Sequence, residues 1–136
     1  MNEPQMRERF AAAAVAHLAT ADAEGRPHIV PIVFALDGDT IYFAVDQKPK
    51  RTRDLKRLRN IAMNPAVALL VDHYDEDWTA LWWIRADGRA RVLDQGPDSE
   101  RALELLALRH PQYRLQAPPG PAVAIAVDRW SAWSAR

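Results

Sequence analysis

The 136-residue chain contains no cysteine, so disulfide bonds, thiol nucleophiles and zinc–cysteine sites are excluded. It also lacks an apolar run near the roughly eighteen residues that a membrane-spanning helix needs. The first residues carry an acidic side chain and no uninterrupted apolar core, so we expect no signal peptide. We therefore expect one soluble domain over residues 1–136 that resides in the cytoplasm.

Motifs for nucleophilic, metal or triphosphate chemistry are also missing. There is no Gly-x-Gly-x-x-Gly or Walker pattern, and no serine has a nucleophile-elbow context. The acidic stretch 72–77 lacks the glycine and the distal carboxylate of a calcium loop. The histidines fall in separate predicted elements without metal-ligand spacing, at His17, His28, His73 and His110. We predict no catalytic side chain and no metal site, so an enzyme of this sequence would need a cofactor to carry the reaction.

The positive charge is concentrated in one short segment. The formal net charge is zero, with 18 basic and 18 acidic residues, yet Lys48–Arg59 holds seven of the basic residues and only one acid, Asp54. The segment follows the β-like run Thr40–Val45 and opens a predicted helix. Cationic side chains and free N–H groups at a helix N-terminus bind phosphate, so the pattern favours a small anion over nucleic acid, which requires a broader basic face. A solvated basic helix without a ligand is the alternative.

Most other segments alternate between strand and turn patterns. Pro31 indicates an edge strand, Gly88 a bulge, and Asp98 or Ser99 the N-cap of a helix. We predict helices over 4–14, from the basic segment to about 62, and over 98–109, an irregular connector over 111–121, and strands over 15–21, 27–36, 40–45, 66–71, 79–93 and 122–133. Hairpin-linked strands with few helices predict a mainly β fold, a small antiparallel barrel of six strands with flanking helices.

The five tryptophans lie in two predicted strand regions, 78–83 and 130–133. Trp82 and Trp83 are adjacent in a strand and therefore face opposite sides. We expect one of them to belong to the core and the other to meet a ligand or a partner subunit.

In order and spacing, several motifs resemble the pyridoxamine 5′-phosphate oxidase-like family of flavin- and deazaflavin-dependent oxidoreductases, and most closely its small branch that uses coenzyme F420. The resemblance covers about residues 8–94. The motifs that carry it are Leu18–Phe34, Ile41–Val45, Lys50–Leu55, Asn64–Leu69 and Trp83–Ala90.

The resemblance implies a single split β-barrel of the FMN-binding type, which binds its cofactor at the interface of a homodimer. Hydride would pass between the cofactor and a small unsaturated or quinone-like substrate, with F420 as the expected cofactor and FMN as the alternative. By position, the strand residues Val30, Pro31, Ile32 and Val33 would lie along the ring, Phe43, Ala44 and Val45 along the ribityl chain, and Lys48, Lys50, Arg51 and Thr52 at the phosphate.

Trp82 and Trp83 stand where the oxidase branch of the family has an Arg-Gln pair that reaches a cofactor from the facing subunit. This departure argues against pyridoxamine phosphate oxidation. The anionic glutamyl tail of F420 could meet the further cations Arg53, Lys56 and Arg57. Three alternatives stay open: an FMN-dependent oxidase or reductase, a cofactor-binding protein without turnover, and haem binding through His17 or His73.

Overall fold

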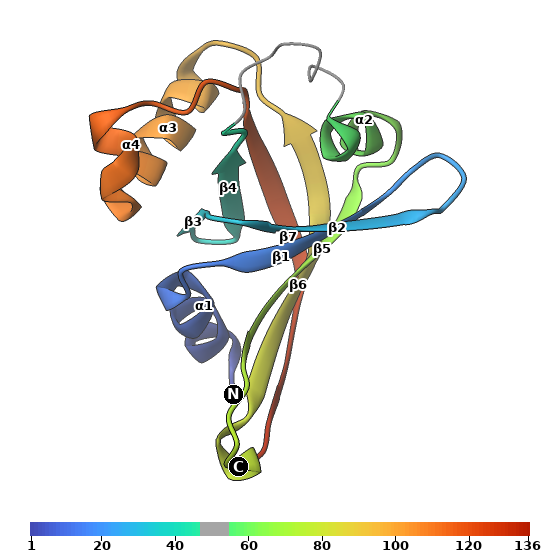
Figure 1. Cartoon of the computed structure of the whole chain (residues 1–136), viewed down its shortest axis with the longest axis vertical. Coiled ribbons are helices and arrows are strands. Elements are labelled where there is room, and N and C mark those ends of the chain that lie inside the picture. The colour runs from blue at the N-terminus through green and yellow to red at the C-terminus, as the bar shows by residue number, and fades with distance from the viewer. Residues whose placement is uncertain (47–54) are drawn as a thin grey trace.

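The computed structural model describes residues 1–46 and 55–136 and builds them around one antiparallel sheet (Figure 1). Within these residues the sheet has seven strands in the spatial order β2-β1-β5-β6-β7-β4-β3. The strands are β1 (Ala16–Ala21), β2 (Pro27–Ile32), β3 (Ala35–Asp37), β4 (Thr40–Ala44), β5 (Ala66–His73), β6 (Trp82–Val92) and β7 (Ala122–Ser134). The fold is the mainly β split barrel expected from the sequence, with seven strands in place of six.

The chain itself forces this sheet to curl. Strands β2 and β3 are the two opposite edges of the sheet, yet only Val33 and Phe34 separate them along the chain. The three Cα–Cα steps from Ile32 to Ala35 span at most about 11 Å, so the two edges must approach each other at this point. The predicted single strand over 27–36 is therefore wrong, because it divides here between two edges.

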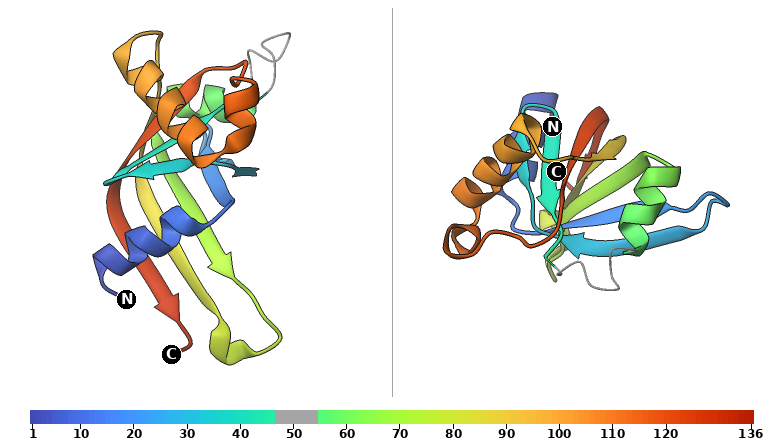
Figure 2. Two further views of the ribbon diagram at one scale, coloured as in Figure 1. Left: turned by 90° about the vertical axis from the view of Figure 1, so that its left-hand side faces the viewer. Right: turned by 90° about the horizontal axis from the view of Figure 1, so that it is seen from above.

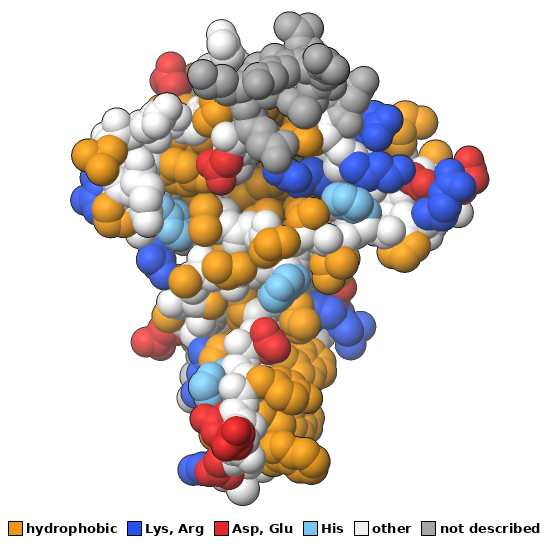
Figure 3. Space-filling view, viewed as in Figure 1, with side chains coloured by type: hydrophobic (Ala, Val, Ile, Leu, Met, Phe, Trp, Pro, Cys, Tyr) orange, Lys and Arg blue, Asp and Glu red, His pale blue; other side chains and the backbone are white. Residues whose placement is uncertain are grey.

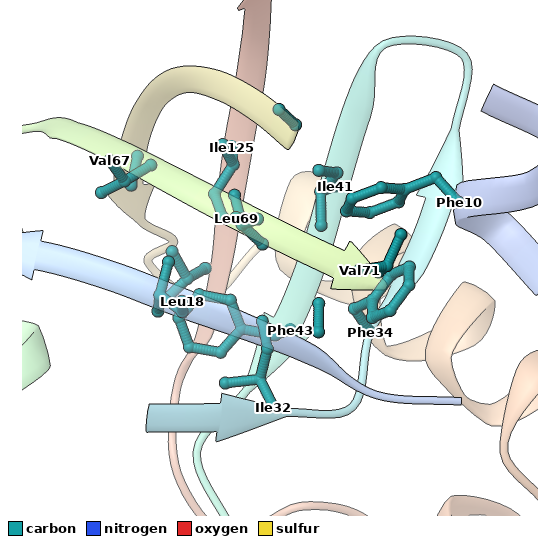
Figure 4. Close-up of a cluster of buried hydrophobic side chains, with 14 of the residues drawn as sticks. Phe10, Leu18, Ile32, Phe34, Ile41, Phe43, Val67, Leu69, Val71 and Ile125 are labelled. Atoms are coloured by element: carbon teal, nitrogen blue, oxygen red, sulfur yellow. The ribbon is translucent and has the colours of Figure 1, made fainter. Parts of the chain in front are cut away.

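The core fills the inside of the curl, as alternation along the strands requires. In β1, Ala16, Leu18 and Thr20 are buried while His17 points outward. The same alternation along the neighbouring strands gathers the inward side chains into one cluster that includes Leu18, Phe34, Phe43 and Leu69 (Figure 4). Side chains on the other face of the sheet remain available for contacts outside the core.

Helices cover the ends and one flank of the barrel (Figure 2). Helix α1 (Glu3–Ala12) inserts Phe10 into the core against Phe34 and Trp130. Helix α2 (Lys56–Met63) packs on β1 and β6, and α3 (Pro97–Arg109) packs on β3, β4 and β7. The short helix α4 (Pro111–Leu115) and the 3-10 turn η2 (Trp78–Ala80) complete the elements. No helix in the described residues is long and apolar enough to cross a membrane.

Two local expectations need correction. The N-cap of α3 is Gly96, with φ of 145° and no side-chain cap, rather than Asp98 or Ser99, because Pro97 already occupies the first helical turn. The connector 111–121 is not wholly irregular, since its first five residues form α4 behind Pro111. The predicted start of the helix in the basic segment falls outside the described residues, and the described part begins at Lys56.

The predicted bulge at Gly88 is confirmed, although its extra residue, Asp128, lies on the partner strand β7. The pairing of β6 with β7 shifts register between Asp87 and Gly88. A Cβ atom on Gly88 would lie 2.3 Å from the backbone oxygen of Ala126. Only glycine allows the two strands to approach this closely, and the bulge adds bend to the curled sheet.

Candidate functional site

A buried polar cluster joins helix α2 to the hairpin of β1 and β2. Thr20 lies opposite His28 in the register of this hairpin, and both side chains belong to the inward-facing row. The Asn60 amide donates a hydrogen bond of 3.0 Å to the Thr20 hydroxyl. Arg57 lies three residues before Asn60 and so shares its helix face. Thr20 and Asn60 are 3% and 2% exposed, which makes them two of the few buried polar residues in the described chain.

Two nitrogens of this cluster have no hydrogen-bond partner in the described structure. They are His28 Nδ1 and Arg57 Nε, and both atoms are inaccessible to solvent. A buried polar group without a partner costs about 1–3 kcal/mol, more when it is charged. Arg57 Nε is an obligate donor on a permanent cation, and His28 Nδ1 donates in one tautomer. Each nitrogen can donate a hydrogen bond to an acceptor that carries negative charge.

At the tip of the same hairpin, Asp22 forms an ion pair with Lys56 of α2. The Asp22 carboxylate accepts hydrogen bonds from the backbone N–H groups of Glu24 and Arg26 and from Arg26 Nε, and it lies 3.6 Å from Lys56 Nζ. The hydrogen bonds from Arg26 depress the pKa of Asp22 well below its ordinary value. Lys56 therefore shares the Asp22 carboxylate with Arg26, whereas Arg57 at the next position carries a nitrogen without an acceptor.

The residues predicted to line a cofactor ring divide between the two faces of β2. Val30 and Ile32 face inward opposite Leu18 and Ala16, and Pro31 is exposed opposite His17. Since β2 is an edge strand, one side of its backbone has no strand partner within the described sheet. Backbone groups, rather than the inward side chains, are what this strand offers to a ligand.

The predicted ribityl-binding residues close the far end of β4. Phe43, Ala44 and Val45 are 0%, 7% and 1% exposed, so their side chains belong to the core. Any contact to a ligand here would come from the backbone or from the residues that follow. The predicted phosphate-binding residues Lys48, Lys50, Arg51 and Thr52 do follow, and they lie outside the described residues.

The two adjacent tryptophans face opposite sides of β6, as expected. Trp82 packs against the core, beneath the Arg9 guanidinium at 5.1 Å from its ring centroid and beside the stacked His73 ring. Trp83 lies on the other face, opposite Asp72 and Trp133, with the Arg85 guanidinium 5.9 Å from its ring. Of the two, Trp82 packs against the core and Trp83 lies on the face of β6 directed away from it.

Trp83 belongs to a wide apolar surface that we call the outer face. It is the convex side of β2, β1, β5 and β6, and it carries an open groove of about 390 Å³. The groove is lined by His17, Ala19, Ile29, Ala68, Leu69, Leu70, Asp72, Tyr74, Trp83 and Arg85. Figure 3 shows hydrophobic side chains gathered along one flank of the long strands. Ile29 is 65% exposed and Tyr74 77%, an unusual concentration of apolar side chains in contact with water.

The histidines do not converge on one centre. His17 lies in the outer groove, His73 is 3.6 Å from Asp75, and buried His110 bonds the Phe34 carbonyl at 2.6 Å. No group of three potential metal ligands occurs in the part of the chain that the structure describes. The inward position of His28 was missed in the sequence, although its alternation with Val30 and Ile32 along one strand could have predicted it.

Comparison with known proteins identifies the family. The sequence model of the pyridoxamine 5′-phosphate oxidase family matches residues 3–134, so the chain belongs to this family. No curated protein matches the sequence significantly.

Solved structures agree on the fold at low sequence identity. A conserved hypothetical protein of Mycobacterium tuberculosis is 19% identical with a TM-score of 0.80, over 100% of this chain and 86% of the other. A FAD-binding protein of Mesorhizobium loti is 19% identical with a TM-score of 0.76, over 97% and 94%. The haem storage protein HutZ of Vibrio cholerae is 16% identical with a TM-score of 0.72, over 97% and 93%. At these identities the likeness establishes the split barrel alone.

Proposed function

We propose that this protein binds a phosphorylated flavin or deazaflavin, with coenzyme F420 as the first candidate and FMN as the second, and transfers hydride between it and a small unsaturated or quinone-like compound. The observation that carries the proposal is the pair of buried nitrogens without acceptors, His28 Nδ1 and Arg57 Nε. A phosphoryl oxygen is an acceptor for both, and hydrogen bonds to charged groups contribute about 1.5–3 kcal/mol each. Family membership supports the same choice.

The position of the pair agrees with the charge pattern of the sequence. Arg57 and His28 lie at the start of α2 and on the hairpin beneath it. Residues 48–53, which directly precede this helix, contribute Lys48, Lys50, Arg51 and Arg53. A phosphate bound near the start of α2 would meet both sets of cations, and the helix N-terminus adds its own free N–H groups.

Hydride transfer asks little acid–base chemistry of the protein, because the bound cofactor supplies the redox centre. The chain's tasks are binding, orientation and exclusion of water. The unpaired edge of β2 offers backbone donors and acceptors to the polar side of a ring, Trp83 offers an apolar wall, and Arg57 and His28 hold the phosphate. These roles explain why the sequence lacks a catalytic triad or dyad.

A second copy of this chain covers the outer face in the proposed functional state. Exposed Ile29, Tyr74 and Trp133 surround the groove, and burial of apolar area contributes about 25 cal/mol per Å². In a homodimer, Trp83 of one copy would approach the cofactor of the other. An indole would then stand where the oxidase branch has its Arg-Gln pair.

The preference for F420 depends on charge. Outside Lys48–Arg59 the chain carries 11 basic and 17 acidic residues, so this one segment of the sequence holds more cations than one phosphate needs. The glutamyl tail of F420 supplies further carboxylates for them. Since Asp22 already engages Lys56, the cations of 48–53 and Arg57 are the expected contacts for this tail.

The test is a fluorescence or calorimetric titration of the purified protein with F420, FMN and riboflavin, followed by mixing of the reduced complex with a simple quinone. We expect F420 to bind more tightly than FMN, and FMN at least about tenfold more tightly than riboflavin, which lacks the phosphate. Equal affinity for FMN and riboflavin contradicts the phosphate assignment. Tighter binding of FMN selects the flavin alternative, and binding without turnover selects the cofactor-binding alternative.

A further inference from the structure

A second groove lies on the outward side of β4, β7 and β6, beside the first turn of α3. Its outward position follows from alternation along the strands, because the intervening side chains of Ile41, Phe43 and Ile125 belong to the core. The groove has a volume of about 290 Å³, and none of its residues lines the groove of the outer face. We call it the alanine groove after the two β7 residues that form its floor, Ala124 and Ala126.

Strand pairing arranges the alanine groove in two parallel rows. Each row runs from a hydroxyl side chain on β4, over an alanine on β7, to an arginine on β6: Thr40–Ala126–Arg89 and Tyr42–Ala124–Arg91. Neighbouring strands lie about 4.8 Å apart, so about 10 Å of floor separates the backbone under the hydroxyls from the backbone under the guanidinium groups. The two methyl groups leave this space open, whereas longer side chains at the same positions would fill it.

The arginines of the alanine groove are paired with carboxylates only at the surface. Arg91 Nη2 lies 3.2 Å from the Asp98 carboxylate, and Arg89 Nε lies 3.8 Å from the Asp128 carboxylate. The four side chains are between 62% and 78% exposed. Ion pairs in such contact with water contribute little to stability, so each arginine can exchange its partner for a ligand at small cost.

We propose that the alanine groove binds a small carboxylate with a flat apolar body, of which an aromatic carboxylate is the simplest form. Arg89 and Arg91 project from the same face of β6, and the planar guanidinium fork matches a carboxylate. The ring would lie over the methyl groups of Ala124 and Ala126, with the Tyr42 ring as one wall.

The charge of the lining favours a singly charged ligand. The two arginines bring two positive charges, and Asp98 at the end of the groove brings one negative charge. The remaining single positive charge complements a carboxylate, whereas the dianion of a phosphate monoester would be repelled by Asp98. The inference goes beyond the proposed function, because the proposed contacts of the cofactor are Arg57, His28 and the edge of β2, outside this groove.

The test is a titration of the full chain with benzoate, benzamide and phenyl phosphate, followed by NMR chemical shifts. We expect benzoate to bind about tenfold more tightly than the neutral amide and more tightly than phenyl phosphate. Arg91→Gln should weaken benzoate binding about tenfold, and Asp98→Asn should strengthen it about threefold because Arg91 loses its competing carboxylate. Ala126→Leu should fill the floor and abolish detectable binding. Arg85→Gln, on the same side of β6 but in the groove of the outer face, is the matched control.

Several results would overturn the inference. Absent benzoate binding, or equal affinity for benzoate and benzamide, removes the carboxylate site, and tighter binding of phenyl phosphate contradicts the ligand class. Weakening by Arg85→Gln in place of Arg91→Gln moves the ligand to the outer face. If thermal unfolding shows that Ala126→Leu does not fold, the exposed substitutions Arg91→Gln and Asp98→Asn decide, and weaker binding by Asp98→Asn contradicts the competition. The titrations with F420 and FMN test the proposed function separately.

Discussion

Arg57 carries the first prediction at the scale of single residues. Its half-buried guanidinium has an Nε without an acceptor, so Arg57→Ala should weaken binding of F420 or FMN by about 1.5–3 kcal/mol. The free protein should lose little or no stability, because the variant removes a donor that the described fold leaves unsatisfied. Calorimetric titration and thermal unfolding measure the two effects. Arg59→Ala, on an exposed position of the same helix, is the control and should change neither.

Asp22 predicts a pH-dependent contribution to stability. Hydrogen bonds from Arg26 lower its pKa in the folded state, so its contribution is present above the unfolded value of about 3.9 and is lost as the pH falls through the folded value. Asp22→Asn should lower the melting temperature at pH 7, and the gap to the wild type should narrow below about pH 4. A gap that stays constant from pH 7 to the acid limit would contradict the role of the charge.

At the scale of elements, the bulge between β6 and β7 depends on Gly88. Gly88→Ala places a methyl group against the Ala126 carbonyl, which is backbone and cannot rotate away. We expect a loss of about 1–3 kcal/mol, the usual cost of overpacking, measured by urea unfolding. Asp87→Ala, the neighbouring change beside the same register shift, should cost clearly less. Equal effects of the two variants would show that the contact relaxes freely.

Helix α1 is anchored by an arginine from α3. The Arg109 guanidinium donates to the carbonyls of Ala11, Ala12 and Ala13 at 3.3–3.5 Å, where the helix would otherwise leave its last acceptors to water. Arg109→Ala should destabilise the fold by about 1 kcal/mol and increase amide hydrogen exchange in α1. Arg114→Ala on α4 is the matched control. Unchanged exchange in α1 would refute the capping role.

The sequence predicted most elements because their patterns are local. The alternation along β1 and β5, the turn before Thr40 and the bulge at Gly88 all follow from neighbours in the chain. The division of 27–36 was not predictable, because Val33 and Phe34 turn the chain only when the two sheet edges are present. Likewise, Gly96 takes the place of the expected cap because Pro97 occupies the first turn of α3, and α4 begins at Pro111, which occupies its own first turn.

The candidate site was predicted in part. The concentration of cations in 48–59 was visible in the sequence, but its chief members lie outside the described residues. The sequence could not predict that His28 Nδ1 and Arg57 Nε are buried without hydrogen-bond partners. Their burial depends on the packing of α2 over a hairpin that lies about thirty positions earlier in the chain. Spacing alone likewise could not show that Asp22 engages Lys56 or that Arg57 Nε has no acceptor.

At the scale of the whole molecule, the outer face predicts self-association. Ile29→Glu places a charge at the centre of the proposed interface, so it should shift the protein from dimer to monomer in sedimentation or light-scattering measurements. Burial of an unpaired carboxylate costs several kcal/mol. Leu115→Glu, at a 91% exposed position on α4, should leave the mass unchanged. A monomeric wild type would remove the partner subunit from the proposed function.

The two-residue crossing at Val33 and Phe34 also constrains how this protein tolerates insertion. Loops at the hairpin tips, such as the one at Gly25, end in solvent and can lengthen without disturbing any strand. An added residue after Ile32 would instead let the two sheet edges, β2 and β3, move apart beside Phe10 and open the barrel there. We therefore expect insertions and deletions in this fold to occur at the hairpin loops and not between β2 and β3, whatever ligand a given member binds.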